Sequence, residues 1–181
     1  RYVLGLDSCE PMIDAAIELI SGADEYRVAD VQDLGFLDNE SFDLAVSYLN
    51  QCDLPDFDAN VREVFRVLKP GGRFVIANLH PMRSAKGGWE RDEQGKRLHA
   101  LLDDYFEESE RHWTILGEEL TNFHRSLSTY LNGFLDAGFV IKRVLEPRVT
   151  LSNLKRYPEL EDERRVPNFI IYVLDKPVPI K

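Results

Sequence analysis

The stretch "FDLAVSYLNQCDLPDFDANVREVFRVLKPGGRFVIANLH", residues 42–80, indicates the fold class because it predicts a strand, a helix and a second strand in succession. Residues 42–47 form a short apolar run with no polar face, which is typical of a strand that helices cover on both faces of a parallel sheet. The Pro-Gly-Gly sequence at 70–72 ends the helix, since proline cannot continue it and glycine takes the positive φ of a sharp reversal. A second strand is predicted over 73–79.

The helix between these strands has its own start signal and its own buried face. Asp56 and Asp58 are suitable N-cap residues, because a carboxylate accepts hydrogen bonds from the free amides of a first helical turn. The apolar positions that follow recur with helical spacing, at Val61, Val64, Phe65 and Leu68. The stretch therefore predicts one βαβ unit of an α/β fold.

Length and cysteine content predict a single domain, 1–181, that needs no disulfide. Cys9 and Cys52 match neither a metal-site spacing nor a disulfide framework, so a reducing cytoplasm is the expected location and no metal site is expected. The sequence has no apolar run near the ~20 residues that span a bilayer, and it has no signal peptide. We therefore expect a soluble cytoplasmic protein without a membrane partner.

The charge balance narrows the class of partner. The formal net charge is −10 at pH 7. Nucleic-acid binding depends largely on Lys and Arg side chains that neutralise phosphates, so an acidic chain argues against DNA, and against RNA, as the main partner. A small-molecule substrate is the expectation that remains, and the sequence leaves the oligomeric state open.

The first thirty residues predict two strands separated by a helix, and each strand is followed by an acid. Residues 2–6 form an apolar strand that Asp7 closes, and residues 26–29 form a second strand that ends in Asp30. Ser8 is suited to cap the helix between them. The apolar positions of this helix are Ile13, Ala16, Ile17 and Ile20. The chain has no initial methionine and opens inside a strand, so we expect that a preceding segment is absent from this sequence.

The two acids lie where open α/β sheets bind ligands, at the carboxyl ends of successive parallel strands. A carboxylate after a strand can accept both hydroxyl hydrogens of a ribose, and a second acid one strand over can accept from an exocyclic amine. Adenosine presents both groups. The alternatives are that Asp7 only caps the following helix and that Asp30 is a solvated turn residue.

Two segments carry a resemblance to a known family. "FDLAVSYLNQCDLPD" (42–56) and "REVFRVLKPGGRFVIANLHP" (62–81) resemble the fourth-strand motif and the following turn of the class I S-adenosylmethionine-dependent methyltransferases. The segment "HRSLSTYLNGFLDAGFVIKRVLEP" (124–147) also resembles the last helix and the sixth strand of small-molecule members. The resemblance implies a doubly wound, seven-stranded Rossmann-like sheet whose last strand is antiparallel and lies between the fifth and sixth. The family's first strand and glycine-rich loop would precede Arg1.

The resemblance also implies a set of cofactor-binding residues. Asp7 would hold the ribose, Ser8 and Met12 would line the nucleoside, Asp30 would accept from the adenine amine, and the backbone of Val31 would meet the ring. Helix packing is the alternative for Met12.

The loop after the fourth strand would face the reacting centre. Ser47, Tyr48 and Asn50 would line the methyl-transfer site there, with Tyr48 resting against the sulfonium. The alternative for all three is loop capping and turn chemistry.

Residues 81–124 interrupt the α/β pattern and are expected to form an insert, or lid, over the substrate site. An amphipathic helix is predicted from Leu98 to Phe106, and a hairpin is predicted from residues 113–116 and 120–124, with Gly117 between them. The aromatic side chains of the insert either enclose an apolar substrate or pack the insert onto the sheet; they are Trp89, Tyr105, Phe106 and Trp113.

His80 and His124 are the candidate general bases, because a histidine titrates near neutral pH. A hydrogen-bonded structural role is the alternative for each. Together with Tyr48, they form the set of candidate catalytic residues. A dedicated base is not obligatory, because positioning and desolvation can supply most of the rate of attack on an activated sulfonium.

The predicted activity is the transfer of a methyl group from S-adenosylmethionine to a small-molecule acceptor. The alternatives are a protein or RNA methyltransferase on the same fold, a binding domain that has lost the cofactor, and a nicotinamide-dependent dehydrogenase. The dehydrogenase shares the acidic ribose residue but gives no reason for the LKPGG turn at 68–72. The identity of the acceptor is not encoded in these residues.

Overall fold

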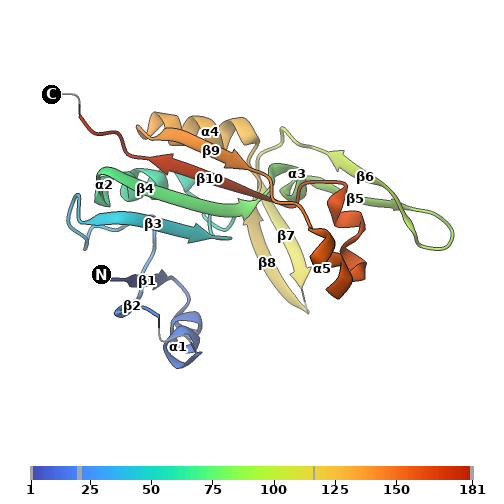
Figure 1. The fold of residues 1–181 in the computed structure, drawn as a ribbon, viewed down its shortest axis with the longest axis horizontal. Helices are drawn as coiled ribbons and strands as arrows, with labels where there is room; N and C mark the ends of the chain where they lie inside the picture. The colour runs from blue at the N-terminus through green and yellow to red at the C-terminus, as the bar shows by residue number, and fades with distance from the viewer. Residues whose placement is uncertain (1, 20–21, 116, 180–181) are drawn as a thin grey trace.

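The βαβ unit predicted from residues 42–80 is present in the computed structural model, which describes residues 2–19, 22–115 and 117–179 (Figure 1). It consists of β3 (Phe42–Tyr48), α2 (Phe57–Val67) and β4 (Leu68–Leu79). β3 and β4 are parallel, and Val46 lies opposite Val75. The unit forms one side of a four-stranded sheet with the order β3-β4-β10-β9.

The ends of α2 follow from its sequence. The Asp56 side chain caps the helix by accepting from the Ala59 amide at 2.8 Å. At the other end Gly71 has a φ of +83°, as the predicted reversal requires. A Cβ on Gly72 would lie 2.8 Å from the Lys69 carbonyl oxygen, so only glycine fits there. The turn is included in β4, which therefore begins at Leu68 and not at the predicted residue 73.

The closing strand has the predicted position and direction. β10 (Phe169–Asp175) is antiparallel to both β4 and β9 (Val140–Leu145), and Tyr172 lies opposite Ile76 and Val144. β10 therefore lies between the strands that correspond to the predicted fifth and sixth. This order agrees with a Rossmann-like methyltransferase sheet.

The hydrophobic core lies between this sheet and the helices α2 and α4 (Leu127–Asp136), which cover one face of it (Figure 1). Phe57 meets Tyr130 edge to face, with ring centroids 4.9 Å apart. The fully buried side chains at the centre include Val61, Phe74, Ile76, Phe134, Ile170, Tyr172 and Leu174.

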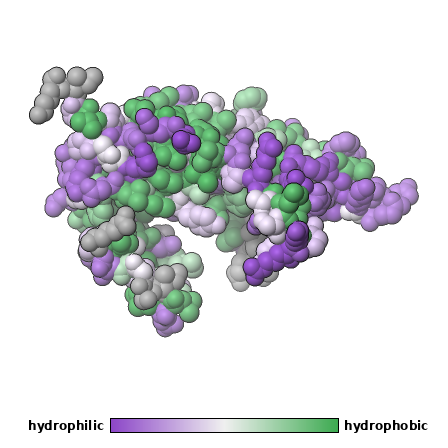
Figure 2. All heavy atoms as spheres, viewed as in Figure 1, coloured by the Kyte–Doolittle hydropathy of each residue, from purple (hydrophilic) through white to green (hydrophobic). Residues whose placement is uncertain are grey.

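The prediction that helices cover residues 42–47 on both faces is wrong for this structure. Leu44, Val46 and Tyr48 are 47%, 69% and 73% exposed, because the described helices that pack on this sheet lie on its other face and β3 is an edge strand. Figure 2 shows apolar side chains gathered over the sheet face that is turned toward the viewer.

The N-terminal residues form a separate small unit. β1 (Leu4–Asp7) and β2 (Glu25–Val28) pair in parallel, and α1 (Glu10–Leu19) connects them. The described strands therefore form separate sheets of two and four strands beside the insert. The predicted seven-stranded sheet includes a first strand placed before Arg1, so its full strand number stays a prediction. Within α1 Ile13 is buried but Ile17 is 58% exposed, so the predicted apolar stripe is only partly covered. Ile20 lies outside the described residues.

The insert consists of a short helix and two hairpins. α3 (Pro81–Ser84) is followed by β5 (Lys86–Arg91) paired with β6 (Arg97–Asp103), and by β7 (Glu110–Ile115) paired with β8 (Glu118–Phe123). Both hairpins extend from the end of the sheet toward which β3 and β4 point (Figure 1). The second hairpin confirms the prediction around Gly117, whose φ is +89°.

The helix predicted from Leu98 to Phe106 is wrong, because most of that segment forms β6. Asp92 accepts from the amides of Gln94 and Lys96, and this turn brings Ala100 opposite Trp89. Strand pairing across the turn thus overrides a helical spacing whose apolar side chains remain exposed.

The segment between β9 and β10 is partly helical. It contains α5 (Leu151–Arg156) and two single-turn 3-10 helices, Pro158–Leu160 and Asp162–Arg164.

Candidate active site

A cleft of about 170 Å³ lies where β1, β2 and β3 end. Its walls come from the segments that follow these three strands. The lining residues are Asp7, Ser8, Ala29, Asp30, Val31, Gln32, Asn50, Asp53, Leu54 and Pro55. The fold therefore places a hollow at the carboxyl ends of the parallel strands, the edge at which a ligand was predicted to bind.

The Asp7 carboxylate lines this cleft and also shapes the turn into α1. Its Oδ1 accepts from the Cys9 amide at 2.8 Å, while its backbone oxygen accepts from the Ala29 amide at 2.9 Å. A carboxylate has about four acceptor positions, so one local hydrogen bond leaves capacity for a ligand. Both interpretations of Asp7, ribose binding and turn capping, are therefore compatible with the geometry.

Asp30 is held in place by its neighbour Gln32. The Asp30 Oδ1 accepts from the Gln32 backbone amide at 2.9 Å and from Gln32 Nε2 at 3.0 Å. Gln32 Oε1 in turn accepts from the Asp56 amide at 2.7 Å, at the start of α2. The start of α2 therefore holds the Asp30 carboxylate in its orientation through Gln32.

Hydrogen bonds of amide side chains connect the loops that follow β2 and β3. Gln51 Nε2 donates to Ser47 Oγ at 3.1 Å and to Asn60 Oδ1 at 2.9 Å. Asn60 Nδ2 donates to the Val31 carbonyl at 2.7 Å. Because Asn60 belongs to α2, the helix holds both loops that line the cleft.

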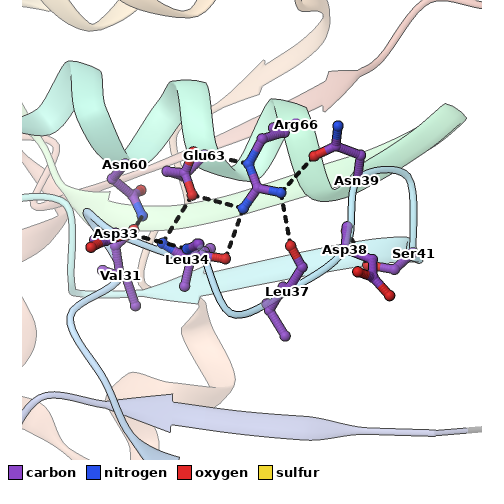
Figure 3. Close-up of polar contacts among 11 residues, drawn as sticks. Val31, Asp33, Leu34, Leu37, Asp38, Asn39, Ser41, Asn60, Glu63 and Arg66 are labelled. Atoms are coloured by element: carbon purple, nitrogen blue, oxygen red, sulfur yellow. Dashed lines mark hydrogen bonds and ion pairs between the residues drawn. The ribbon is translucent and has the colours of Figure 1, made fainter.

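The segment after Val31 is fixed to the same helix, as Figure 3 shows. Arg66 donates to the carbonyls of Leu34 and Leu37 at 2.7 and 2.8 Å, and Glu63 accepts from the Leu34 amide at 2.9 Å. The β2 side of the cleft therefore rests on hydrogen bonds to α2.

Asp53 is a cleft residue that was not predicted. Its Oδ1 accepts from Asn122 Nδ2 at the end of β8 and from Cys52 Sγ at 3.4 Å. Partial removal from water, with a smaller repulsion from the Asp7 carboxylate, raises the pKa of Asp53. An acid that follows a strand is the signal that predicted Asp7 and Asp30, and the same signal could have identified Asp53. Asp53, however, lies five positions beyond Tyr48, the last residue of β3.

Three carboxylates, Asp7, Asp30 and Asp53, give the cleft an anionic wall. Among its described lining residues none is Lys, Arg or His. The described residues also contain no group of three His, Cys, Asp or Glu side chains placed to hold a metal ion. An anionic wall of this kind favours a ligand that carries hydroxyl or amine donors and a positive charge. It disfavours a ligand that carries phosphate.

The cleft brings together Asp7, Ser8, Asp30, Val31 and Asn50 from the predicted cofactor set, but not its other three members. Met12 is 58% exposed on α1, and Ser47 lies behind the cleft as an acceptor for Gln51. Tyr48 lines a separate apolar hollow of about 190 Å³, which it shares with Leu49, Ala77, Pro147, Phe169 and Ile171. The roles of all eight residues in binding the cofactor stay predictions.

His124 is enclosed and fully hydrogen-bonded. It is 1% exposed, and its Nε2 must donate to the Tyr105 carbonyl, 2.9 Å away, because a carbonyl only accepts. Nδ1 then accepts from Ser84 Oγ at 2.8 Å. Burial is the main cause that lowers the pKa of His124. With both ring nitrogens occupied, the geometry favours the structural alternative over general-base catalysis.

His80 is in a similar position. Its Nδ1 accepts from the Met82 amide at 3.1 Å and so caps α3, which leaves Nε2 to donate to Glu146 Oε1 at 3.1 Å. Burial lowers the pKa of His80, and Glu146 partly opposes this effect. The residue is 5% exposed and links α3 to Glu146, which follows β9.

Comparison with known proteins identifies the class that this fold and cleft define, the Rossmann-like methyltransferases. Residues 1–76 match the family described as a methyltransferase domain. A crystal structure of an S-adenosylmethionine-dependent methyltransferase from Mesorhizobium loti is 35% identical, with a TM-score of 0.84 over 96% of this chain and 80% of that chain. A Listeria monocytogenes structure assigned to the same enzymes is 32% identical, with a TM-score of 0.87 over 97% of this chain and 79% of that one.

The chain belongs to the class I S-adenosylmethionine-dependent methyltransferase family. Among curated proteins it is similar to demethylmenaquinone methyltransferase of Listeria welshimeri, with 29% identity over 150 residues. It also resembles phthiotriol/phenolphthiotriol dimycocerosates methyltransferase of Mycobacterium leprae, with 39% identity over 77 residues. The chain spans 62% of the length of the Listeria relative and 28% of the Mycobacterium relative. Among the described helices, none combines the length and the apolar character needed to cross a membrane.

Proposed function

We propose that this protein transfers a methyl group from S-adenosylmethionine to a small-molecule acceptor. The observation that carries the proposal is the cleft in which the carboxylates of Asp7 and Asp30 meet Asn50 at the ends of three strands. Ribose hydroxyls and the adenine amine are hydrogen-bond donors, so these acceptors fit the nucleoside half of the cofactor.

The charge of the cleft supports this cofactor over its rivals. S-adenosylmethionine carries a sulfonium and an ammonium group and no phosphate, and three carboxylates with no described cation favour such a ligand. A nicotinamide dinucleotide brings a pyrophosphate, which Asp53 and Asp7 would repel. The acidic wall therefore argues against the dehydrogenase alternative.

The contribution of the protein to the reaction is positioning. S-adenosylmethionine supplies a methyl group that is already activated by the positive sulfur. The residues of this chain bind and orient the nucleoside through Asp7 and Asp30, and Asn50, which lines the cleft after β3, would face the acceptor. Tyr48 ends β3 and lines the separate apolar hollow, so its contact with the sulfonium stays a prediction. The buried histidines offer no free ring nitrogen among the described contacts, so no proton transfer is assigned to them.

The acceptor is proposed to be a small molecule because the relatives are named for demethylmenaquinone and for phthiotriol dimycocerosates. The insert, residues 81–124, is proposed to act as the lid, since both of its hairpins extend from the ligand edge of the sheet (Figure 1). A protein or RNA acceptor remains the alternative, against which the net charge of −10 argues.

Calorimetry on the full-length protein tests the proposal. We expect S-adenosylmethionine to bind in the micromolar range, about −8 kcal/mol in free energy, and NAD to bind at least tenfold more weakly. The absence of binding at millimolar S-adenosylmethionine would support the cofactor-free binding domain instead. Tighter binding of NAD would support the dehydrogenase.

A further inference from the structure

One short segment contacts every residue of the loop that follows Asn50. Residues 122–125, at the junction of β8 and α4, donate to five consecutive residues, 51–55. Asn122 donates to the Asp53 carboxylate, and the Phe123 amide donates to the Cys52 carbonyl at 2.6 Å. We call residues 122–125 the clamp.

Arg125 makes the remaining contacts of the clamp. Its guanidinium donates to the carbonyls of Gln51, Leu54 and Pro55 at 3.4, 2.6 and 2.9 Å. The same group lies over two aromatic rings, 5.5 Å from the centroid of Phe57 and 5.7 Å from that of Phe123. The Arg125 side chain therefore touches both ends of the loop at once.

Arg125 is unusual because it carries a positive charge in a largely buried position. The residue is only 9% exposed, and among the described residues no Asp or Glu forms an ion pair with it. Burying a cation is costly unless its donors are satisfied, and in this protein backbone carbonyls accept from them. Hydrogen bonds to three carbonyls of one loop limit the arrangements that the loop can adopt, so the Arg125 side chain holds residues 51–55 in place.

The loop that Arg125 holds is part of the cleft wall. Asp53, Leu54 and Pro55 line the cleft directly, and Asn50 lies immediately before the first clamped residue. A change in the path of this loop would move these side chains relative to Asp7, which lines the same cleft from the end of β1.

We infer that Arg125 is a positioning residue for cofactor binding, which sets the conformation of loop 51–55 and thereby links the insert to the cleft. This inference rests on the proposed function, because the ligand whose affinity it sets is S-adenosylmethionine. Arg125 is not among the residues that line the cleft, so it acts through the loop.

Lys176 provides a matched control for the substitution. It is also 9% exposed, donates to the carbonyls of Phe65 and Leu68 at 3.0 and 2.8 Å, and lies over the Phe65 ring, with Glu40 3.5 Å away. It follows β10, at the end of the sheet opposite the hairpins (Figure 1). Lys176→Met thus removes a buried cation from two carbonyls without touching the cleft.

The experiment compares Arg125→Lys, Asn122→Ala and Lys176→Met in the full-length protein. Lysine keeps the charge of Arg125 but has no planar fork to reach three carbonyls. We expect the Kd of S-adenosylmethionine to rise about tenfold or more in Arg125→Lys and less in Asn122→Ala, because loss of one or more hydrogen bonds leaves the loop free to move. Lys176→Met is expected to lower the melting temperature but to leave the Kd within about twofold of the unaltered protein.

Hydrogen exchange of the backbone amides at 50–54 and 56 supplies a second measurement. Cofactor should protect these amides in the unaltered protein and protect them less in Arg125→Lys. Unchanged affinity and protection in Arg125→Lys, or an equal loss of affinity in Lys176→Met, would overturn the positioning role while leaving the proposed function intact. The absence of cofactor binding by the unaltered protein would overturn both.

Discussion

Among the individual residues, Asp7 has two roles to separate. Its carboxylate accepts from the Cys9 amide at the turn into α1 and also lines the cleft. A turn role needs only an oxygen acceptor, whereas a ribose-binding role gains from the negative charge. The two roles therefore respond differently to loss of charge alone.

Asp7→Asn and Asp7→Ala test this distinction. Asparagine retains an oxygen for the Cys9 amide, so the turn should persist, but cofactor affinity should fall about tenfold, since a hydrogen bond to a charged group contributes ~1.5–3 kcal/mol. Calorimetry with S-adenosylmethionine measures the affinity, and thermal unfolding reports on the turn. Full affinity in Asp7→Asn combined with lower stability in Asp7→Ala would reduce Asp7 to a capping residue.

Among the secondary-structure elements, β4 begins with a turn, residues 68–72, that leads the chain from α2 into the sheet. Its shape depends on glycine for two different reasons, the positive φ of Gly71 and the lack of space at Gly72. A Cβ on Gly72 would meet two backbone oxygens, of Lys69 at 2.8 Å and of Asp43 at 3.2 Å. Backbone atoms cannot move aside as a flexible side chain can.

Gly72→Ala should therefore lower the free energy of unfolding by about 1–3 kcal/mol, the usual range for overpacking. Gly35→Ala is the control, because its Cβ would meet the end of the Asp33 side chain at 3.1 Å, which can rotate away. Denaturant unfolding measures both variants. Equal stability of the two would show that the α2–β4 turn is less constrained than its backbone contacts indicate.

Across the molecule as a whole, two buried histidines hold the insert in place. His124 connects segments within the insert, through Ser84 and Tyr105, and His80 connects the start of the insert to Glu146, the residue after β9. Burial lowers the pKa of both side chains below the ordinary value of about 6.5. The unfolded chain therefore binds more protons than the folded protein as the pH falls through that value.

The stability that these two histidines contribute should therefore be fully present above about pH 6.5. It should be lost as the pH falls toward the lower pKa values of the folded histidines. His124→Gln removes one of the two groups, so its free energy of unfolding should fall less between pH 7 and about pH 5 than that of the unaltered protein. Denaturant titrations at several pH values give the two slopes. Parallel slopes would mean that His124 remains accessible to protons in the folded state.

Local signals in the sequence were enough to predict several elements and one edge of the site. Helical spacing with an N-cap and a glycine turn predicted α2 and β4, and the acids after two strands predicted the edge at which Asp7 and Asp30 line the cleft. These features depend on neighbours within a few residues, so backbone propensity and periodicity suffice to predict them.

Contacts between segments that are far apart in the sequence, in contrast, depend on tertiary packing alone. Arg125 reaches the Leu54 carbonyl across 71 positions of sequence, and Asn122 reaches Asp53 across 69. Strand pairing converted the helix predicted from Leu98 onward into β6, and packing enclosed His124. Burial, pKa and pairing depend on contacts that form only when the chain collapses, and spacing along the sequence does not encode those contacts.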